Sequence, residues 1–226
     1  MFSDYYHNES SKRYICNKCN SIIITVIHRT APELKPEEII EECTAATKWA
    51  YENAQEYGGD KNKIVLFGVG QSANLSLSVS LKLKEKNEIS LIKLLVLISP
   101  ILSFKFDTKS WKTYGNGDFG ISQKQFEWLY SVYNPLYNSH DSPLLSPLLA
   151  SNFIHFPNVI LFSAGFDPHL DHCKAIVTKM MKSGIHVTHQ HYTSFIYSFF
   201  ENIFLPMCRE KSHLRITELI TKALEK

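Results

Sequence analysis

The most constraining feature of the chain is the stretch from Lys63 to Leu75, where an apolar run meets a turn of small residues. Residues 64–67 are β-prone, and the pattern after residue 72 is helical. A strand that turns sharply into a helix exposes the residue at its tip, and this arrangement is typical of a nucleophilic serine. The turn contains one serine, Ser72, within Gly-Gln-Ser-Ala-Asn. The function therefore depends on whether Ser72 stands at the tip.

Strand-like and helix-like segments alternate along the whole chain. Continuous apolar runs, typical of strands buried on both faces of a parallel sheet, cover residues 21–27, 63–67, 91–98 and 158–164. Residues 185–192 alternate like a final strand. Helical patterns cover residues 3–20, 36–57, 73–86, 122–133, 167–183 and 214–225. The alternation predicts an α/β fold in which helices flank a mostly parallel sheet on both faces.

The length and composition suit one globular domain. With 226 residues, the chain is long enough for one sizeable α/β domain, which we take as residues 1–226. Residues 103–152 break the alternation with aromatic residues, serines and prolines, so we interpret them as a cap-like insertion. A formal net charge of +2 gives no reason to expect nucleic acid as a partner. No apolar run approaches the ~20 residues of a membrane span.

Metal and disulfide chemistry are not favoured by the sequence. The five cysteines have no regular spacing, which argues against a disulfide framework. Acidic residues, histidines and a cysteine cluster within residues 167–173, but acids at a helix start are explained by the helix dipole. We therefore predict no metal site.

Several motifs match one family in order along the chain. They are His28–Glu33, similar to a Tyr-Arg-Leu-Ala-Pro-Glu motif, and residues 57–60, 145–149, 165–171 and 184–189. Together they resemble the hormone-sensitive-lipase-like carboxylesterases, in the branch of the arylacetamide deacetylases. The resemblance runs from about residue 3 to the C-terminal region. It implies a three-layer α/β-hydrolase fold, a Ser-Asp-His triad, ester or amide substrates and no cofactor.

The family's elbow reads Gly-Asp-Ser-Ala-Gly-Gly-Asn-Leu, and it aligns with this chain without a gap. That register puts Gly68 on the first glycine, Val69 on the aspartate and Gly70 on the nucleophilic serine. Ser72 could be the nucleophile only if the chain slipped by two residues. The slip would put Asn74 where the elbow requires a small residue, so the nucleophile position is predicted to be degenerate.

The other two triad positions differ from each other. Asp167 falls on the acid of the triad, although an aspartate there is also a good helix N-cap. Tyr197 occupies the histidine position, and a phenol with a reference pKa of ~10 cannot act as a base near neutral pH. His189 and His191 lie in the preceding strand, on one face of it, and neither is an easy substitute.

The resemblance also implies a His-Gly-Gly-Gly oxyanion loop before the first helix, and residues 1–226 contain nothing like it. Each lost oxyanion donor costs on the order of 10²–10³ in rate. The strand leading into that loop would lie between the strands at residues 21–27 and 63–67. Without these N-terminal strands, the two either pair directly or leave a gap with two unpaired edges.

Three hypotheses follow from these observations. The leading one is a catalytically degenerate α/β-hydrolase domain that binds an apolar ester, a lipid-like small molecule or a partner protein. The second is an active serine carboxylic-ester hydrolase that uses Ser72 with Asp167 and a recruited histidine. The third is a truncated copy without activity. A cytoplasmic location is the default expectation, and a membrane anchor is expected if a segment precedes Met1.

Overall fold

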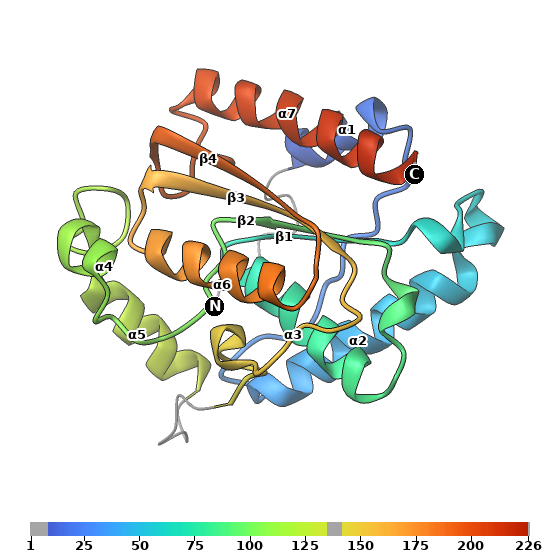
Figure 1. The fold of residues 1–226 in the computed structure, drawn as a ribbon, viewed down its shortest axis with the longest axis horizontal. Coiled ribbons are helices and arrows are strands. Elements are labelled where there is room, and N and C mark those ends of the chain that lie inside the picture. The colour runs from blue at the N-terminus through green and yellow to red at the C-terminus, as the bar shows by residue number, and fades with distance from the viewer. Residues whose placement is uncertain (1–8, 135–141, 226) are drawn as a thin grey trace.

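The computed structural model describes residues 9–134 and 142–225, which form three layers with a sheet in the middle (Figure 1). The parallel sheet has the order β1 (Val65–Val69), β2 (Leu94–Ile98), β3 (Asn158–Phe166), β4 (Val187–Ile196). On one face lie α1 (Glu9–Lys18) and α7 (Pro206–Leu224). On the other face lie α2 (Pro36–Asn53), α3 (Gln71–Glu85) and α6 (Leu170–Lys182). The predicted α/β fold with a parallel sheet between helices is confirmed.

Two hydrophobic cores form because alternate residues of each strand point to opposite faces of the sheet. In β2, Leu95 and Leu97 belong to the core under α2, α3 and α6, whereas Leu94, Val96 and Ile98 belong to the core under α1 and α7. Every residue of β2 is buried. This explains why the run is continuously apolar rather than alternating, as expected for a central parallel strand.

The predicted strand at residues 21–27 is wrong. The segment forms neither a helix nor a strand, and its side chains are exposed, with Ile22 at 50% and Ile27 at 60%. A strand exists only where a neighbour completes its hydrogen-bonded ladder, and among the described residues β1 is paired on one side only, with β2. A β-branched composition alone therefore does not form the strand.

Smaller differences concern where the elements begin and end. The last strand continues to Ile196 instead of ending at residue 192, and α7 begins at Pro206 instead of residue 214. The first turns of α7 are exposed, with Met207 at 82%, so the apolar periodicity starts only where the helix reaches the sheet. Residues 1–8, part of the predicted first helix, lie outside the described residues.

The stretch 103–152 contains two helices among its described residues. Helix α5 (Gln123–Tyr133) agrees with the predicted helix, and α4 (Lys109–Tyr114) was not predicted. Single 3₁₀ turns complete the elements: η1 (Ala54–Tyr57), η2 (Lys61–Lys63), η3 (Ile89–Leu91) and η4 (Pro147–Leu149). In Figure 1, α4 and α5 lie beyond one end of the sheet.

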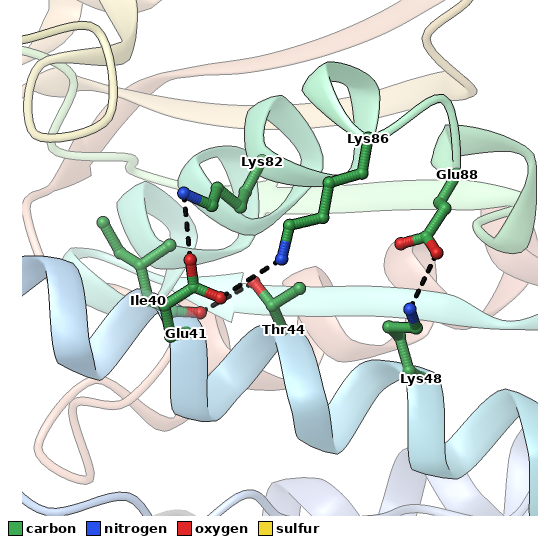
Figure 2. A network of polar contacts seen from close by, with 7 residues as sticks. All are labelled: Ile40, Glu41, Thr44, Lys48, Lys82, Lys86 and Glu88. Atoms are coloured by element: carbon green, nitrogen blue, oxygen red, sulfur yellow. Dashed lines mark hydrogen bonds and ion pairs between the residues drawn. The ribbon is translucent and has the colours of Figure 1, made fainter.

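Ion pairs join the outer surfaces of α2 and α3 (Figure 2). The carboxylate of Glu41 in α2 lies 2.9 Å from Lys82 Nζ and 3.3 Å from Lys86 Nζ in α3. Lys48 in α2 pairs with Glu88 just after α3, at 2.7 Å. Exposed pairs of this kind contribute at most about 1 kcal/mol each, so the buried apolar face of α3 holds it against the sheet.

Candidate functional site

A sharp elbow joins β1 to α3. Gly70 precedes α3 with φ +56° and ψ −113°, a backbone conformation that L-residues rarely adopt. A Cβ on Gly68 would lie 2.4 Å from the backbone of Ser72 and Ala73, so only glycine allows the helix to approach the strand this closely. The Gly70 N–H donates to the Ile98 carbonyl at 2.9 Å and fixes the turn against β2.

The side chain of Tyr197 lies against Gly70. The Tyr197 hydroxyl is 3.1 Å from the place that a Cβ on Gly70 would occupy. Tyr197 directly follows β4, and its N–H donates to the Phe166 carbonyl at the end of β3, at 3.2 Å. Burial, together with the nearby carboxylates of Asp167 and Glu201, raises the pKa of Tyr197 well above its usual value of 10. Tyr197 is therefore a neutral phenol at neutral pH.

Asp167 follows β3 and is completely buried. Desolvation raises its pKa to about 6, against the opposing effect of the His169 N–H, which donates to Oδ1 at 2.8 Å. The Ser99 side chain also lowers this pKa, although it does not reach Oδ2 in hydrogen-bonding geometry. Since the charge of Asp167 affects Tyr197, the structure brings Gly70, Asp167 and Tyr197 together at the carboxyl end of the sheet.

A cavity of about 120 Å³ opens at the elbow. It is lined by Val69, Gly70, Gln71, Ile98, Ser99, Tyr197, Ser198, Phe199, Phe200 and Glu201. Both serines in this lining have positive φ angles, +41° for Ser99 and +65° for Ser198. Such strained backbone occurs preferentially at ligand and active sites. Neither serine could be identified as a site residue from the sequence, because backbone strain at a non-glycine residue has no sequence pattern of its own.

Ser72 lies apart from this cavity. It is in the first turn of α3, where its carbonyl accepts a hydrogen bond from the Ser76 hydroxyl at 2.9 Å. Ser72 lines a second cavity, of about 70 Å³, whose wall also includes His28 and Tyr133. Neither Asp167 nor Tyr197 lines that second cavity. Asp167 lines neither cavity, and among the described residues no hydrogen bond joins it to Ser72.

His169 is a buried histidine that sequence reasoning missed as a site residue. It is completely buried, and neither of its ring nitrogens has a hydrogen-bond partner among the described residues. Its ring contacts Trp111 at 5.0 Å and Phe126 at 4.9 Å between ring centroids. Desolvation lowers its pKa to about 3, so the ring is neutral. No three His, Cys, Asp or Glu side chains of the described residues converge as a metal site would require.

A second polar group lies between β3 and β4. Ser163 Oγ is 2.8 Å from His189 Nε2 and 2.9 Å from His191 Nδ1, so both histidines share one hydroxyl. Ser163 is completely buried. Burial lowers the pKa of both histidines, and Lys174 on α6 adds to this effect. The shared face of the histidines was predicted, but the serine comes from the neighbouring strand and could not be paired with them from the sequence.

We predict that Gly70→Ser lowers the free energy of unfolding by about 1–3 kcal/mol. The serine would have to adopt the disfavoured φ of Gly70, and its side chain would meet the Tyr197 hydroxyl. Adding Tyr197→Phe removes that hydroxyl and should recover part of the loss. The measurement is chemical denaturation of the two single variants and the double variant. Purely additive effects would show that the two positions do not touch.

Comparison with known proteins agrees with the fold. Residues 3–201 match the model of a family described as alpha/beta hydrolase fold. The chain is 32% identical over 181 residues to an arylesterase of Saccharolobus solfataricus, covering 78% of this chain and 57% of the relative. It is 27% identical over 165 residues to an arylacetamide deacetylase of Bos taurus, covering 69% of this chain and 41% of the relative. The chain thus spans about half the length of these curated relatives.

Solved structures show the same fold. Carboxyl esterase 2 of Tuber melanosporum superposes with a TM-score of 0.91 at 21% identity, over 99% of this chain and 75% of that one. In the described part of this chain, no helix combines the length and the apolar character needed to cross a membrane. The family match and the sequence relatives establish that the chain belongs to the alpha/beta hydrolase fold family, among the hormone-sensitive-lipase-like carboxylesterases.

Proposed function

We propose that this chain is a member of the carboxylesterase family that does not hydrolyse esters through its elbow, and that the elbow serves as a binding site. The observation that carries the proposal is the pairing of Gly70 with Tyr197. Gly70, at the strained tip of the elbow, has no side-chain hydroxyl. The nearest polar group is the Tyr197 phenol, 3.1 Å from the place that a Cβ on Gly70 would occupy. Because the pKa of Tyr197 is raised, the residue in the histidine position cannot act as the base that activates a nucleophile there.

An active serine hydrolase is the alternative, and two serines have to be considered for it. Ser72 borders a different cavity from Tyr197, and Asp167 lines neither cavity. Ser163 has two histidine partners, as an activated nucleophile would, but its completely buried hydroxyl cannot meet a substrate. A nucleophile must come within about 3.5 Å of the carbonyl that it attacks, and the buried Ser163 hydroxyl does not offer that approach.

The elbow cavity supports binding of a small apolar molecule. Its volume of about 120 Å³ is close to the ~150 Å³ of an engineered cavity that holds benzene. Val69, Ile98, Phe199 and Phe200 form the apolar part of its wall. The relatives reported above are named as two esterases and an arylacetamide deacetylase, so we propose a small apolar ester or lipid-like molecule as the ligand. We also propose residues 103–152 as the cap, since Trp111 and Phe126 cover His169 next to Asp167.

Covalent labelling tests the proposal directly. We expect a fluorophosphonate probe to leave the wild-type chain unlabelled under conditions that fully label an active arylesterase. Ser72→Ala and Ser163→Ala serve as matched variants. Labelling of the wild type that disappears in either variant would identify that serine as a nucleophile and refute the non-hydrolytic reading.

A further inference from the structure

A buried hydroxyl joins two histidines across β3 and β4. Ser163 of β3 lies directly opposite His191 of β4, and His189 is on the same face of β4. Ser163 Oγ is 2.8 Å from His189 Nε2 and 2.9 Å from His191 Nδ1, and the two ring centroids are 6.1 Å apart. Ser163 is completely buried, whereas both rings are half-buried. We call this group the Ser163 bridge.

The Ser163 bridge determines where its hydrogens lie. A hydroxyl has a single hydrogen, so Ser163 donates to one imidazole nitrogen and accepts the N–H of the other ring. Burial and then Lys174 lower the pKa of His191, whereas a hydrogen bond to the Ser163 main chain raises it. Only an acceptor, the carbonyl, raises a histidine pKa, so Nδ1 of His191 carries a hydrogen and faces Ser163. Nε2 of His189 then accepts the Ser163 hydroxyl.

The two rings therefore respond differently to a proton. In His191 the basic nitrogen is Nε2, which takes no part in the Ser163 bridge, so its protonation leaves both hydrogen bonds intact. In His189 the basic nitrogen is the Nε2 atom that accepts the Ser163 hydroxyl, so a proton there ends that hydrogen bond. It also places two positively charged rings next to each other. The Ser163 bridge thus accepts one proton unchanged and breaks with the second.

The charges around the Ser163 bridge do not compensate a second proton. Burial lowers the pKa of both histidines most, His191 and Lys174 lower that of His189 further, and Lys174 lowers that of His191. β3 and β4 contain no Asp, Glu, Lys or Arg. None of the other charged or titratable residues of α6 shifts either pKa: Asp171, His172, Cys173, Lys179 and Lys182. Since the pKa of His189 is held below its usual ~6.5, the second proton binds only in acid.

The Ser163 bridge lies just before the strand ends that carry the candidate site. The pairing of β3 and β4 shifts register directly after it, between Ala164 and Phe166. Asp167 follows β3 and Tyr197 follows β4, and the Tyr197 N–H donates to the Phe166 carbonyl at 3.2 Å. A break in the Ser163 bridge therefore loosens the two strands at the point from which they position both residues.

We propose that the Ser163 bridge is an acid-sensitive latch that holds Asp167 and Tyr197 in place, closed with at most one proton on its two histidines and opened by the proton on His189. Because the open state binds the His189 proton more tightly than the closed state, lowering the pH favours opening. The latch acts on the positions of two side chains, so it does not depend on whether the elbow binds a ligand.

Histidine side-chain nitrogen NMR of the full chain, from about pH 7.5 to about pH 4.5, tests the hydrogen positions. We expect the Nδ1–H tautomer on both rings at the upper pH, and titration of His191 before His189. Ser163→Ala removes the hydrogen bond to His189 Nε2, so the proton affinity of His189 should rise about 5-fold. The matched control is His186→Gln, which changes an exposed histidine before β4 and should leave both titrations unchanged. An Nε2–H tautomer of His189 in the wild type, or titration of His189 first, would overturn the proposal.

Hydrogen exchange of the Tyr197 amide tests the latch itself. The side-chain oxygen introduced by His189→Gln can accept the Ser163 hydroxyl but takes no proton, so this variant should stay closed in acid. At about pH 4.5 the Tyr197 amide should exchange at least ~5-fold faster in the wild type than in His189→Gln, and at about pH 7.5 the two rates should be equal. Both proteins retain Asp167, whose pKa of about 6 lies in the same range, so comparison at one pH removes its effect.

Equal exchange of the Tyr197 amide in the wild type and His189→Gln at the lower pH would show that the Ser163 bridge does not hold the strand ends, and would overturn the proposal. Circular dichroism checks that both variants are folded. The tautomers and the order of titration are measured on the wild type without any substitution, so they decide the hydrogen positions even if a variant unfolds.

Discussion

Gly165→Ala is expected to remove at least ~3 kcal/mol of folding stability, a large part of the 5–15 kcal/mol typical of a domain. A Cβ on Gly165 would lie 1.9 Å from the Thr193 carbonyl oxygen on the neighbouring strand. The new Cβ would meet backbone atoms of Thr193, so no side-chain rotation relieves the contact. β3 and β4 shift register at this point, between Ala164 and Phe166. Moving the strands apart there would displace both Asp167 and Tyr197.

Thermal and chemical unfolding, followed by circular dichroism, measure this effect. Gly184→Ala provides the control, because Gly184 has a positive φ of +80° but nothing within 4 Å of its missing Cβ. We expect it to cost only about 1 kcal/mol, from backbone conformation alone. If Gly165→Ala and Gly184→Ala lost the same free energy of unfolding, steric contact between β3 and β4 would not be the cause of the loss in Gly165→Ala.

His169→Leu is expected to stabilise the protein, and to do so most at acid pH. The completely buried ring has no partner for either nitrogen, and leaving such groups unpaired costs about 1–3 kcal/mol. Its folded pKa of about 3 lies below the unfolded value of ~6.5, so the unfolded chain binds the proton more tightly. The effect of this titration on the free energy of unfolding is therefore most favourable above pH ~6.5. The free energy of unfolding decreases as the pH falls toward 3, because protonation favours the unfolded chain. One such proton makes the free energy of unfolding rise by ~1.4 kcal/mol per pH unit in this range, and His169→Leu should lack this slope.

Asp167→Asn should have the opposite effect on the pH dependence. The folded pKa of Asp167, about 6, lies above the unfolded value of ~3.9, so this carboxyl favours folding below pH 4 and loses that contribution as the pH rises to 6. Between these pH values it opposes the histidine. Removing it should make the acid loss of stability steeper, whereas His169→Leu makes it shallower. Denaturation curves measured from pH 4 to 8 would contradict the assignment if both variants changed the slope in the same direction.

The parts of the fold that are predictable from sequence are those set by local pattern. The elbow was predictable, because a β-prone run, small residues and a helical pattern coincide at Gly68 and Gly70. The buried strands β2 and β3 were predictable for the same reason. The segment at residues 21–27 has an equally strong local pattern and still forms no strand, because strand formation also depends on a neighbour that only the tertiary structure reveals.

The candidate site was predictable only in part. Asp167, Gly70 and Tyr197 were identified by position in a family motif, and the structure brings them together, but their interpretation as a degenerate triad remains a prediction. The unpartnered ring of His169 and the bridge from Ser163 to two histidines depend on what packs around each side chain. Neither the burial of a histidine nor a contact between strands leaves a periodic signal in the sequence.

The contact between Gly70 and Tyr197 also constrains how this chain could change over time. A serine acquired first at position 70 would meet the Tyr197 hydroxyl, and it would do so before any histidine was present to activate it. Loss of the phenol at position 197 leaves room at the elbow, so a hydroxyl at position 70 is expected to cost less stability after that change than before it. The two positions are therefore expected to change in a preferred order, with position 197 first.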